Sequence, residues 1–570
     1  MTAFDESRTP GVEMPLPSES AQTLVEAMHD LRTGEGRGFH FVGRDREERF
    51  FAYEDLLAEA KRRAGFLAGL GLTQGDRAAI VVGEPHEFVL TFLGCVVAGV
   101  IPAPIFPRAS FKNAESYIET LAHIMGTAGA KVAFCMEGNR DIVEQAADRV
   151  KDLKLVGVEA AFEGEAPPAP DVTIGPDDLC FLQFTSGSTS KPKGVMVTHA
   201  NLVANARAFL GPAGLDRTDD DLGVTWLPLF HDMGLIGFVL GTLVCDIPVI
   251  ILPTETFARS PGLWLQTISD RRGTITFAPN FAYQLVTRRI KDRQLAELDL
   301  SCLRIAGCGA EPIRARTLQA FAARFGPAKF DERAFLPSYG MAEATLAITF
   351  HPRSDAIVVD RIDPEAMKAG RAEATDKDDA LEVISCGVGF PGHEVRVVDD
   401  EGKALPERRV GQVVARGPSI TAGYFENPEA SAEGWKDGWL QTGDLGYFAE
   451  GSLYICGRIK DLIIIRGSNH YPQDIEWAIG DLEGVRRGNV CAFSVMKDGT
   501  EELIVSAEAG RADAERLREE IPRVVRQSFG LVPADVVLTR VGTLPKTSSG
   551  KTQRRKTRAM YENGELGGHA

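Results

Sequence analysis

The sequence predicts an α/β protein: a large N-terminal domain of doubly wound α/β sheets with a small β-rich subdomain, followed by a small α+β C-terminal domain. Three observations support this fold class. Helical and strand patterns alternate from about residue 20 to about residue 157, as in sheets that helices cover on both faces. Short strands dominate from about 394 to 457, and the residues beyond form a compact α+β pattern.

Length and composition are those of a globular protein with two or more domains. The chain has 570 residues, of which 44% are hydrophobic and 25% are charged, and a single core rarely serves more than about 300 residues. The formal net charge of -17 argues against a nucleic-acid partner, because phosphate binding needs a basic surface.

The cysteines and apolar runs indicate a cytoplasmic protein. The nine cysteines form no Cys-x-x-Cys pair and mostly lie in apolar runs, which is typical of buried thiols in a reducing compartment. The N-terminus lacks the apolar stretch of a secretory signal. Pro102, Pro104 and Asp246 interrupt the apolar runs 88–106 and 235–252, so neither run supplies the roughly 20 continuous apolar residues of a membrane span.

The first elements follow from apolar runs of strand or helix length. Residues 78–82 and 131–135 are predicted strands, whereas 87–98 has the length and periodicity of a helix. The proline-rich segment 164–170 is a predicted connector. It leads to 179–184, an apolar run that predicts a buried strand.

The loop after this strand, residues 185–194, has the sequence TSGSTSKPKG. Its small residues, hydroxyls and glycines allow several backbone N–H groups to point at one centre, and its two lysines add positive charge. Loops bind phosphate in this way, although the spacing does not match the Walker pattern. Composition alone also fits a flexible surface loop.

A helix is predicted at 198–210, and His231 and Asp232 then follow an apolar strand. Sheets of α/β proteins place ligands at this position, but such a pair also caps helices. A helix with an aromatic face begins at residues 279–281. It either lines an apolar pocket or packs in the core.

Two strand-then-glycine turns, 304–312 and 337–345, each place a carboxylate beside small residues. The small residues let a ligand approach the backbone. A carboxylate near polyphosphate is electrostatically unfavourable unless a cation lies between them. Since oxygen ligands suit Mg²⁺, Glu343 is a magnesium candidate.

Three later segments bear on function. Residues 348–383 are polar and poorly periodic, which predicts a surface insertion. Asp444, between glycines, either stabilises a turn or binds a sugar diol. The basic segment 544–555, LPKTSSGKTQRR, is either a solvated tail or a functional loop.

Together these segments resemble the adenylate-forming superfamily, which includes acyl-CoA synthetases, luciferases and peptide-synthetase adenylation domains. The resemblance covers nearly the whole chain, and seven motifs occur in the order of the superfamily. They are the phosphate loop at 185–194, the gate motif at 226–234, the adenine and magnesium motifs at 309–312 and 338–343, the ribose motif at 442–444, the hinge at 457–461 and the catalytic-lysine loop at 545–551.

Within the superfamily, the sequence is most similar to the fatty acyl-AMP ligases. The insertion at about 348–383 falls where those ligases carry residues that acyl-CoA synthetases lack. The other segments that support this likeness are 231–237, 279–283, 339–346 and 468–472.

The resemblance implies a role for each motif residue. The catalytic candidates are Lys551 for the carboxylate and α-phosphate, Glu343 for Mg²⁺, and His231 between the acyl tunnel and the phosphates. The nucleotide-binding candidates are Thr185, Ser186, Gly187, Ser188, Thr189 and Lys193 for the β- and γ-phosphates, Tyr339 stacked on adenine with Ala310 and Glu311 at its edge, and Asp444 and Arg458 for the ribose. The other nucleotide-binding candidates are Gly309, Pro312, Ser338, Gly340, Met341 and Ala342. The acyl-binding candidates are Phe230, Pro279, Asn280 and Phe281.

The resemblance also implies a division into domains. A hinge at Asp461 separates the N-terminal domain, 1–460, from a mobile C-terminal domain, 461–570, that carries Lys551. Ala342 departs from the superfamily, which usually has threonine before the magnesium glutamate. Thr345 is expected to supply the missing phosphate contact.

These roles imply a two-step reaction. The enzyme activates a medium- or long-chain fatty acid with ATP and Mg²⁺ to an acyl-adenylate and releases pyrophosphate. The fatty carboxylate is ionised at neutral pH, so its attack on the α-phosphorus needs positioning and charge neutralisation but no general base. Rotation of the C-terminal domain then withdraws Lys551 and admits a phosphopantetheine thiol.

For fatty acyl-AMP ligases this thiol belongs to an acyl carrier protein. Because the sequence shows no carrier domain, we expect a separate carrier protein, in a polyketide or peptide-synthetase pathway. Two alternatives stay open. One is a fatty acyl-CoA ligase, and the other is a non-catalytic acyl-nucleotide-binding protein, which the presence of both Lys551 and Glu343 disfavours.

Overall fold

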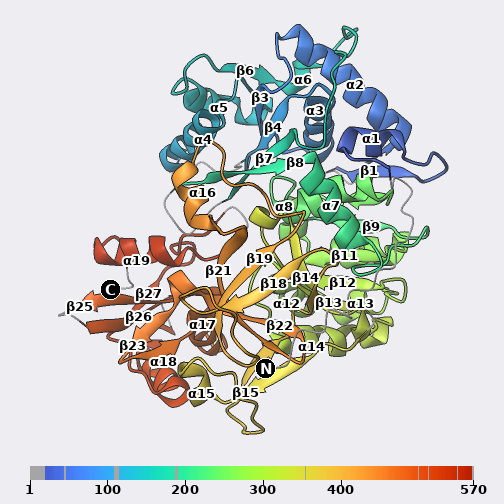
Figure 1. Ribbon diagram of the computed structural model, residues 1–570. Coiled ribbons are helices and arrows are strands. Elements are labelled where there is room, and N and C mark those ends of the chain that lie inside the picture. Colours follow the sequence, from blue (N-terminus) through green and yellow to red (C-terminus); the bar gives the residue numbers. More distant parts are fainter. Residues whose placement is uncertain are drawn as a thin grey trace.

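The computed structural model describes residues 20–43, 47–107, 114–185, 191–353, 355–497, 500–510, 513–547 and 550–567. Figure 1 shows the first α/β layers (blue to cyan) above a central sheet (green to yellow), with the last elements (orange to red) at the lower left. Among the described residues, no helix combines the length and apolar character that crossing a bilayer requires.

A four-stranded parallel sheet forms the first layer. Its strands, in spatial order, are β4 (Ile101–Pro104), β3 (Arg77–Val81), β5 (Val132–Cys135) and β6 (Lys154–Gly157). Side chains alternate along a strand, so Ala78 and Ile80 of β3 join the main core, whereas Ala79 and Val81 join a second cluster on the other face.

Helices cover both faces of this sheet, as the doubly wound prediction requires. On the side of the main core lie α2 (Tyr53–Gly69) and α3 (Pro85–Val97), and α1 (Leu24–His29) packs beside α2 in the same core. Those of the other face are α4 (Ala114–Ala128) and α5 (Arg140–Ala147).

The central sheet has nine strands. In spatial order they are β17 (Val388–Gly389), β14 (Ala347–Phe350), β13 (Phe335–Gly340), β12 (Ile305–Cys308), β11 (Ile275–Ala278), β9 (Gly223–Thr225), β10 (Val249–Ile251), β1 (Gly38–Val42) and β2 (Glu48–Ala52). The strands from β13 to β1 are parallel. Their carboxyl ends therefore meet at one edge of the sheet, which is where the motif residues follow each strand.

The helices around the central sheet share the main core with α2 and α3. They are α7 (His199–Leu210), α11 (Gly262–Arg271), α12 (Asn280–Arg289) and α14 (Ala315–Phe325). Shorter helical segments follow β9 and β10, namely α8 (Asp232–Leu235), the π-helical turn Ile236–Leu240, α9 (Gly241–Val244) and α10 (Thr254–Arg259).

The elements predicted at 78–82, 87–98, 131–135, 179–184 and 198–210 are confirmed as β3, α3, β5, β7 (Leu179–Thr185) and α7. One local difference occurs after the phosphate-loop segment. A strand, β8 (Lys193–Thr198), precedes α7 and pairs antiparallel with β7, with Lys193 opposite Thr185. The β-branched Val195 and Val197 favour this strand, so the segment connects a hairpin rather than a strand and a helix.

The predicted β-rich subdomain is an antiparallel sheet. Its strands are β18 (Glu394–Val398), β19 (Gly411–Arg416), β20 (Trp435–Lys436), β21 (Trp439–Ala449) and β22 (Ser452–Arg458). The pairing of β21 with β22 places Asp444 opposite Arg458.

The insertion at 348–383 is more ordered than its polar composition predicts. It contains β15 (Val359–Ile362) and α15 (Pro364–Lys368), and β15 pairs with β16 (Leu381–Ile384). Ile362 and Met367 are buried in one cluster with Tyr447 and Tyr471. The insertion is therefore packed between the β-rich subdomain and the C-terminal residues.

The C-terminal elements have an apolar core of their own, which includes Ile475, Val505 and Leu517. The elements are β23 (Ile463–Ile465), β24 (Ser468–His470), α17 (Pro472–Gly480), β25 (Val485–Lys497), β26 (Thr500–Ala509), α18 (Ala514–Phe529), β27 (Asp535–Thr539) and α19 (Arg554–Glu562). The guanidinium of Arg314 donates two hydrogen bonds to Asp481, at 3.1 and 2.5 Å, and so links α17 to the N-terminal region.

Candidate active site

A cavity of about 2620 Å³ lies among the central sheet, the β-rich subdomain and the C-terminal elements. Of the predicted site residues that the structure describes, all line it except Gly309, Pro279 and Thr345. Gly309 packs so closely on Ser338 that a Cβ would lie 2.6 Å from the serine Oγ, and Pro279 caps α12. Four predicted residues lie outside the described residues, namely Ser186, Gly187, Ser188 and Thr189.

Asp444 is held from two sides at the wall of this cavity. Tyr339 donates its hydroxyl hydrogen to Asp444 Oδ2 at 2.7 Å, and Arg458 Nε donates to Oδ1 at 2.9 Å. The backbone N–H of Asp444 donates to Thr442 Oγ1. Because each carboxylate oxygen accepts more than one hydrogen bond, the oriented carboxylate can still accept from the two hydroxyls of a ribose.

Glu343 is buried and has a partner that the sequence did not reveal. Tyr424 donates its hydroxyl hydrogen to Glu343 Oε1 at 2.7 Å, and Lys193 Nζ lies 4.8 Å from the centre of the Tyr424 ring. Burial raises the pKa of the Glu343 carboxyl. Tyr424 follows no motif and lies 81 residues further along the chain, so only the tertiary structure brings it to Glu343.

The environment of Glu343 fits a magnesium ion. A cation beside this carboxylate would favour its ionised form against burial. The described residues contain no group of three or more His, Cys, Asp or Glu side chains that could enclose a metal. Mg²⁺ at nucleotide sites typically uses one or two carboxylates and takes its other ligands from phosphates and water, and Glu343 supplies such a carboxylate.

His231 both caps a helix and lines the cavity, so the two interpretations of this residue are compatible. The backbone N–H of Met233 donates to His231 Nδ1 at 3.3 Å, at the start of α8. The same Nδ1 lies 2.6 Å from Asp232 Oδ1. Asp232 also lines the cavity, and its position beside His231 was the sequence signal for it.

Lys551 lies on a tight turn of the C-terminal segment. Lys546 and Thr552 form a β-bridge, and the Thr547 N–H donates to the Lys551 carbonyl at 2.8 Å. Gly550 has φ +86°, a conformation that favours glycine. The turn directs Lys551 into the cavity, where burial lowers the pKa of its ammonium group while the Asp232 charge opposes that shift.

The predicted hinge residue, Asp461, lies in the turn Ile459–Asp461. Arg554 Nη1 donates to Asp461 Oδ2 at 2.8 Å, and Arg554 Nη2 donates to Glu476 Oε2 at 2.6 Å. The carboxylate of Asp461 is thus tied to the first residue of α19, three residues after Lys551.

The chain matches the sequence model of the AMP-binding enzymes over residues 35–425. It belongs to this adenylate-forming family. A Caulobacter vibrioides protein named provisionally as an acyl-CoA synthetase is 39% identical over 96% of both chains. The medium-chain-fatty-acid–[acyl-carrier-protein] ligase JamA of Moorena producens is 34% identical over 92% of this chain and 91% of its own.

A solved structure from a study of fatty acyl-adenylate ligases of E. coli and L. pneumophila superposes with a TM-score of 0.91. It is 34% identical and covers 96% of this chain and 99% of the other. The protein is therefore an adenylate-forming ligase of the fatty acid ligase group, with ATP as a substrate. The predicted fold class is confirmed.

One expected contact of this adenylate-forming enzyme is wrong. Thr345 was expected to replace the hydroxyl that Ala342 lacks, but its side chain is fully buried. Its Oγ1 donates to the Ser419 carbonyl at 2.7 Å. The hydroxyl is committed to the backbone and does not line the cavity, because the turn at Thr345 (φ +68°) directs it away from the site.

The position of Asp232 predicts the pH dependence of this ligase. On the role that the resemblance implies for Lys551, its ammonium group acts in the protonated form, so we expect activity to fall as the pH rises through its lowered pKa. We expect Asp232→Asn to shift the alkaline limb of the pH–rate profile to lower pH, because the Asp232 charge raises the pKa of Lys551. Asp292→Asn, at a side chain that is 91% exposed, should leave the limb in place. An alkaline limb that stays still or moves upward in Asp232→Asn would contradict this electrostatic role.

Proposed function

We propose that this enzyme is a fatty acyl-AMP ligase that passes its acyl group to a separate acyl carrier protein. One observation carries the proposal: Lys551 of the C-terminal segment lines the same cavity as Glu343 and Asp444, and that cavity continues into a chamber walled by phenylalanine rings. A nucleotide, a reacting carboxylate and an alkyl chain can therefore occupy one continuous space.

The first step needs two anions brought together. The fatty carboxylate attacks the α-phosphorus of ATP, a new acyl–phosphate bond forms, and pyrophosphate leaves with the electrons of the broken bond. Lys551 neutralises the charge that gathers on the carboxylate and α-phosphate oxygens. The other residues orient the substrates: Asp444 and Arg458 hold the ribose, and Lys193 binds the outer phosphates.

Magnesium has a defined place in this proposal. Glu343 would hold the ion, and the ion, when bound, neutralises charge on the phosphates. Tyr424 keeps the Glu343 carboxylate oriented toward the cavity through its 2.7 Å hydrogen bond.

The acceptor in the second step is the finer part of the proposal. The similarity to the carrier-protein ligase JamA supports a carrier protein as the acceptor, and the similarity to solved fatty acyl-adenylate ligases supports the acyl-adenylate as the first product. The insertion at 348–383 also supports a carrier protein, because fatty acyl-AMP ligases carry extra residues at this place. Here the insertion is folded, and its Met367 packs in one cluster with Tyr471. The name of the Caulobacter relative favours a fatty acyl-CoA ligase as the second candidate.

The two candidates differ in the fate of the acyl-adenylate. We would incubate the enzyme with ATP, Mg²⁺ and dodecanoate, follow acyl-adenylate, and then divide the sample between coenzyme A and a phosphopantetheinylated carrier protein. A fatty acyl-AMP ligase should release AMP rapidly with the carrier and only slowly with coenzyme A. Comparable rates with coenzyme A would make the enzyme an acyl-CoA ligase, and no adenylate with any acid would refute the proposed function.

A further inference from the structure

The apolar part of the cavity runs along the central sheet, from the carboxyl ends of its parallel strands to their amino ends. Neighbouring rings join Phe238 to Phe277 at 6.3 Å, Phe277 to Phe350 at 5.8 Å, and Phe350 to Phe209 at 6.4 Å between centroids. All four rings line the cavity, which begins at Phe230 on the nucleotide side.

The far end lies at the start of the parallel strands. Gly223 and Ile275 are the first residues of β9 and β11, are paired in register and both line the cavity. The four residues of β11 span about 10 Å at the usual rise per residue. The chamber thus extends about that far beyond the strand ends where the nucleotide residues lie, which suits an alkyl chain of medium length or longer.

Leu215 lies at this end, where its carbonyl accepts a hydrogen bond from Arg304, just before β12. Its side chain is 1% exposed and lines the cavity. It belongs to a loop, 211–221, that folds back on α7: the Leu215 N–H donates to the Phe209 carbonyl at 2.8 Å, and the Arg217 N–H donates to the Leu210 carbonyl at 3.0 Å. A Cβ at Gly214 would lie 2.1 Å from the Phe209 carbonyl oxygen, so the turn requires glycine there.

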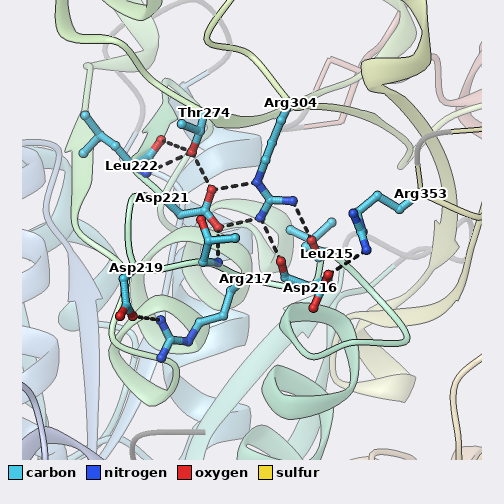
Figure 2. A network of polar contacts seen from close by, with 10 residues as sticks. Leu215, Asp216, Arg217, Asp219, Asp221, Leu222, Thr274, Arg304 and Arg353 are labelled. Carbon is cyan, nitrogen blue, oxygen red and sulfur yellow. Dashed lines mark hydrogen bonds and ion pairs between the residues drawn. The ribbon is translucent and has the colours of Figure 1, made fainter. Parts of the chain in front are cut away.

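An ion pair between the partly buried Arg304 and the buried Asp221 fixes this loop, as Figure 2 shows. Arg304, just before β12, donates to the Leu215 carbonyl at 2.8 Å and to the Asp216 carbonyl at 3.2 Å. Its Nε donates to Asp221 Oδ1 at 2.9 Å, and the Thr274 hydroxyl donates to the same oxygen at 2.7 Å. One guanidinium therefore holds the backbone at Leu215 and the C-terminal end of the loop at Asp221.

No free polar group faces the far end among the described residues that line it. The side chains of Leu210, Leu215, Ile247 and Ile275 are apolar. The one hydroxyl there, on Thr242, donates to the backbone carbonyls of its own helix, the nearer being Phe238 at 2.9 Å. A polar group at the end of a bound chain would be buried without a partner.

We propose that Leu215 forms the floor of the acyl tunnel and sets the longest unbranched, methyl-terminated fatty acid that the enzyme activates, with Arg304 as the residue that positions this floor. The inference rests on the proposed function and extends it to the substrate class. A chain longer than the tunnel must displace Leu215, which Arg304 resists through the backbone of the loop.

The test compares chain-length profiles of acyl-adenylate formation from octanoate to hexadecanoate in matched variants. Leu215→Ala should move the maximum of kcat/KM to longer acids, and Leu215→Phe to shorter ones, at about fourfold per methylene gained or lost from the tunnel. The kcat/KM for octanoate should stay within about twofold of the wild-type value in both Leu215 variants. Leu202→Ala removes an equally buried leucine of α7 outside the cavity and should keep the wild-type profile.

A second variant covers the case in which Leu215→Phe does not fold. An added methyl at Gly223 would meet Phe238 and Val249 at 3.4 Å, an ordinary contact, so Gly223→Ala should fold and shift the profile toward shorter acids. In the wild type, the ω-hydroxy form of the longest acid accepted should react at least about tenfold more slowly than the parent acid.

The outcomes separate the two proposals. Unchanged profiles in Leu215→Ala and Gly223→Ala, with activity retained, would overturn the tunnel floor and leave the ligase activity intact. Equal rates for the ω-hydroxy and parent acids would also overturn it. Absence of acyl-adenylate in the wild type with every acid would instead refute the proposed function.

Discussion

Replacement of Lys551 by alanine is expected to slow acyl-adenylate formation by about 10² to 10³-fold. Lys551 enters the cavity on a turn whose backbone is fixed by hydrogen bonds to Thr547. Arg458, a neighbouring cation, is already bonded to Asp444. Without Lys551, the meeting carboxylate and α-phosphate lose an ammonium group that lines the same cavity.

The measurement is the rate of pyrophosphate release with dodecanoate. Arg558→Ala serves as the control, because Arg558 belongs to α19 but pairs with Glu562 at 2.9 Å and does not line the cavity. The rate of pyrophosphate release by Arg558→Ala should remain within about twofold of the wild-type rate. The midpoint temperature of thermal unfolding should be the same for the wild type, Lys551→Ala and Arg558→Ala. Transfer from preformed acyl-adenylate should survive in Lys551→Ala, since the lysine acts in the first step. Full adenylation activity in this variant would refute the assignment.

Arg304→Met is expected to lower the free energy of unfolding by about 3 to 5 kcal/mol. Asp221 is 1% exposed, and the variant leaves its charge buried without the guanidinium. Arg293→Met is the control, because Arg293 is 93% exposed and its ion pair with Glu297 should contribute less than about 0.5 kcal/mol. Urea unfolding of the region that contains α7 and β12 gives the comparison. An equal loss of unfolding free energy in Arg304→Met and Arg293→Met would contradict the prediction that the pair of Arg304 and Asp221 stabilises the fold more than an exposed pair does.

The same pair predicts how that loss depends on pH. Burial alone would raise the pKa of Asp221, but the hydrogen bonds and charge of Arg304, together with the hydrogen bonds from Thr218 and Thr274, hold the pKa below its ordinary value. The stabilisation is therefore present above the pKa of the unfolded state and is lost as the pH falls through the pKa of the folded state. The difference between wild type and Arg304→Met should shrink in acid.

Much of the cavity could be predicted from the sequence, because the motifs are local. Glu311 and Glu343 each follow a strand directly, and parallel strands bring their carboxyl ends to one edge whatever the details of packing. Asp444 and Arg458 face each other because a hairpin aligns them. In these cases the covalent neighbours of a residue determine where its side chain lies.

Other features depended on contacts between distant segments. The hydrogen bond from Tyr424 to Glu343 and the burial of the Thr345 hydroxyl against Ser419 join residues that no sequence pattern connects. The polar insertion is ordered because Ile362 and Met367 find apolar partners elsewhere. Composition records neither the partner of a side chain nor its solvent exposure.

The sequence by itself indicated the chemistry of this protein, because the motif residues directly after the strands and the charged groups that an adenylate-forming reaction needs can both be read from it. The tertiary structure alone decided the size of the substrate space. The tunnel ends at Leu215 because Arg304 and Asp221, 83 residues apart, fix the loop that carries it. A cavity is bounded by surfaces from many segments, and its length is set by how they pack against one another.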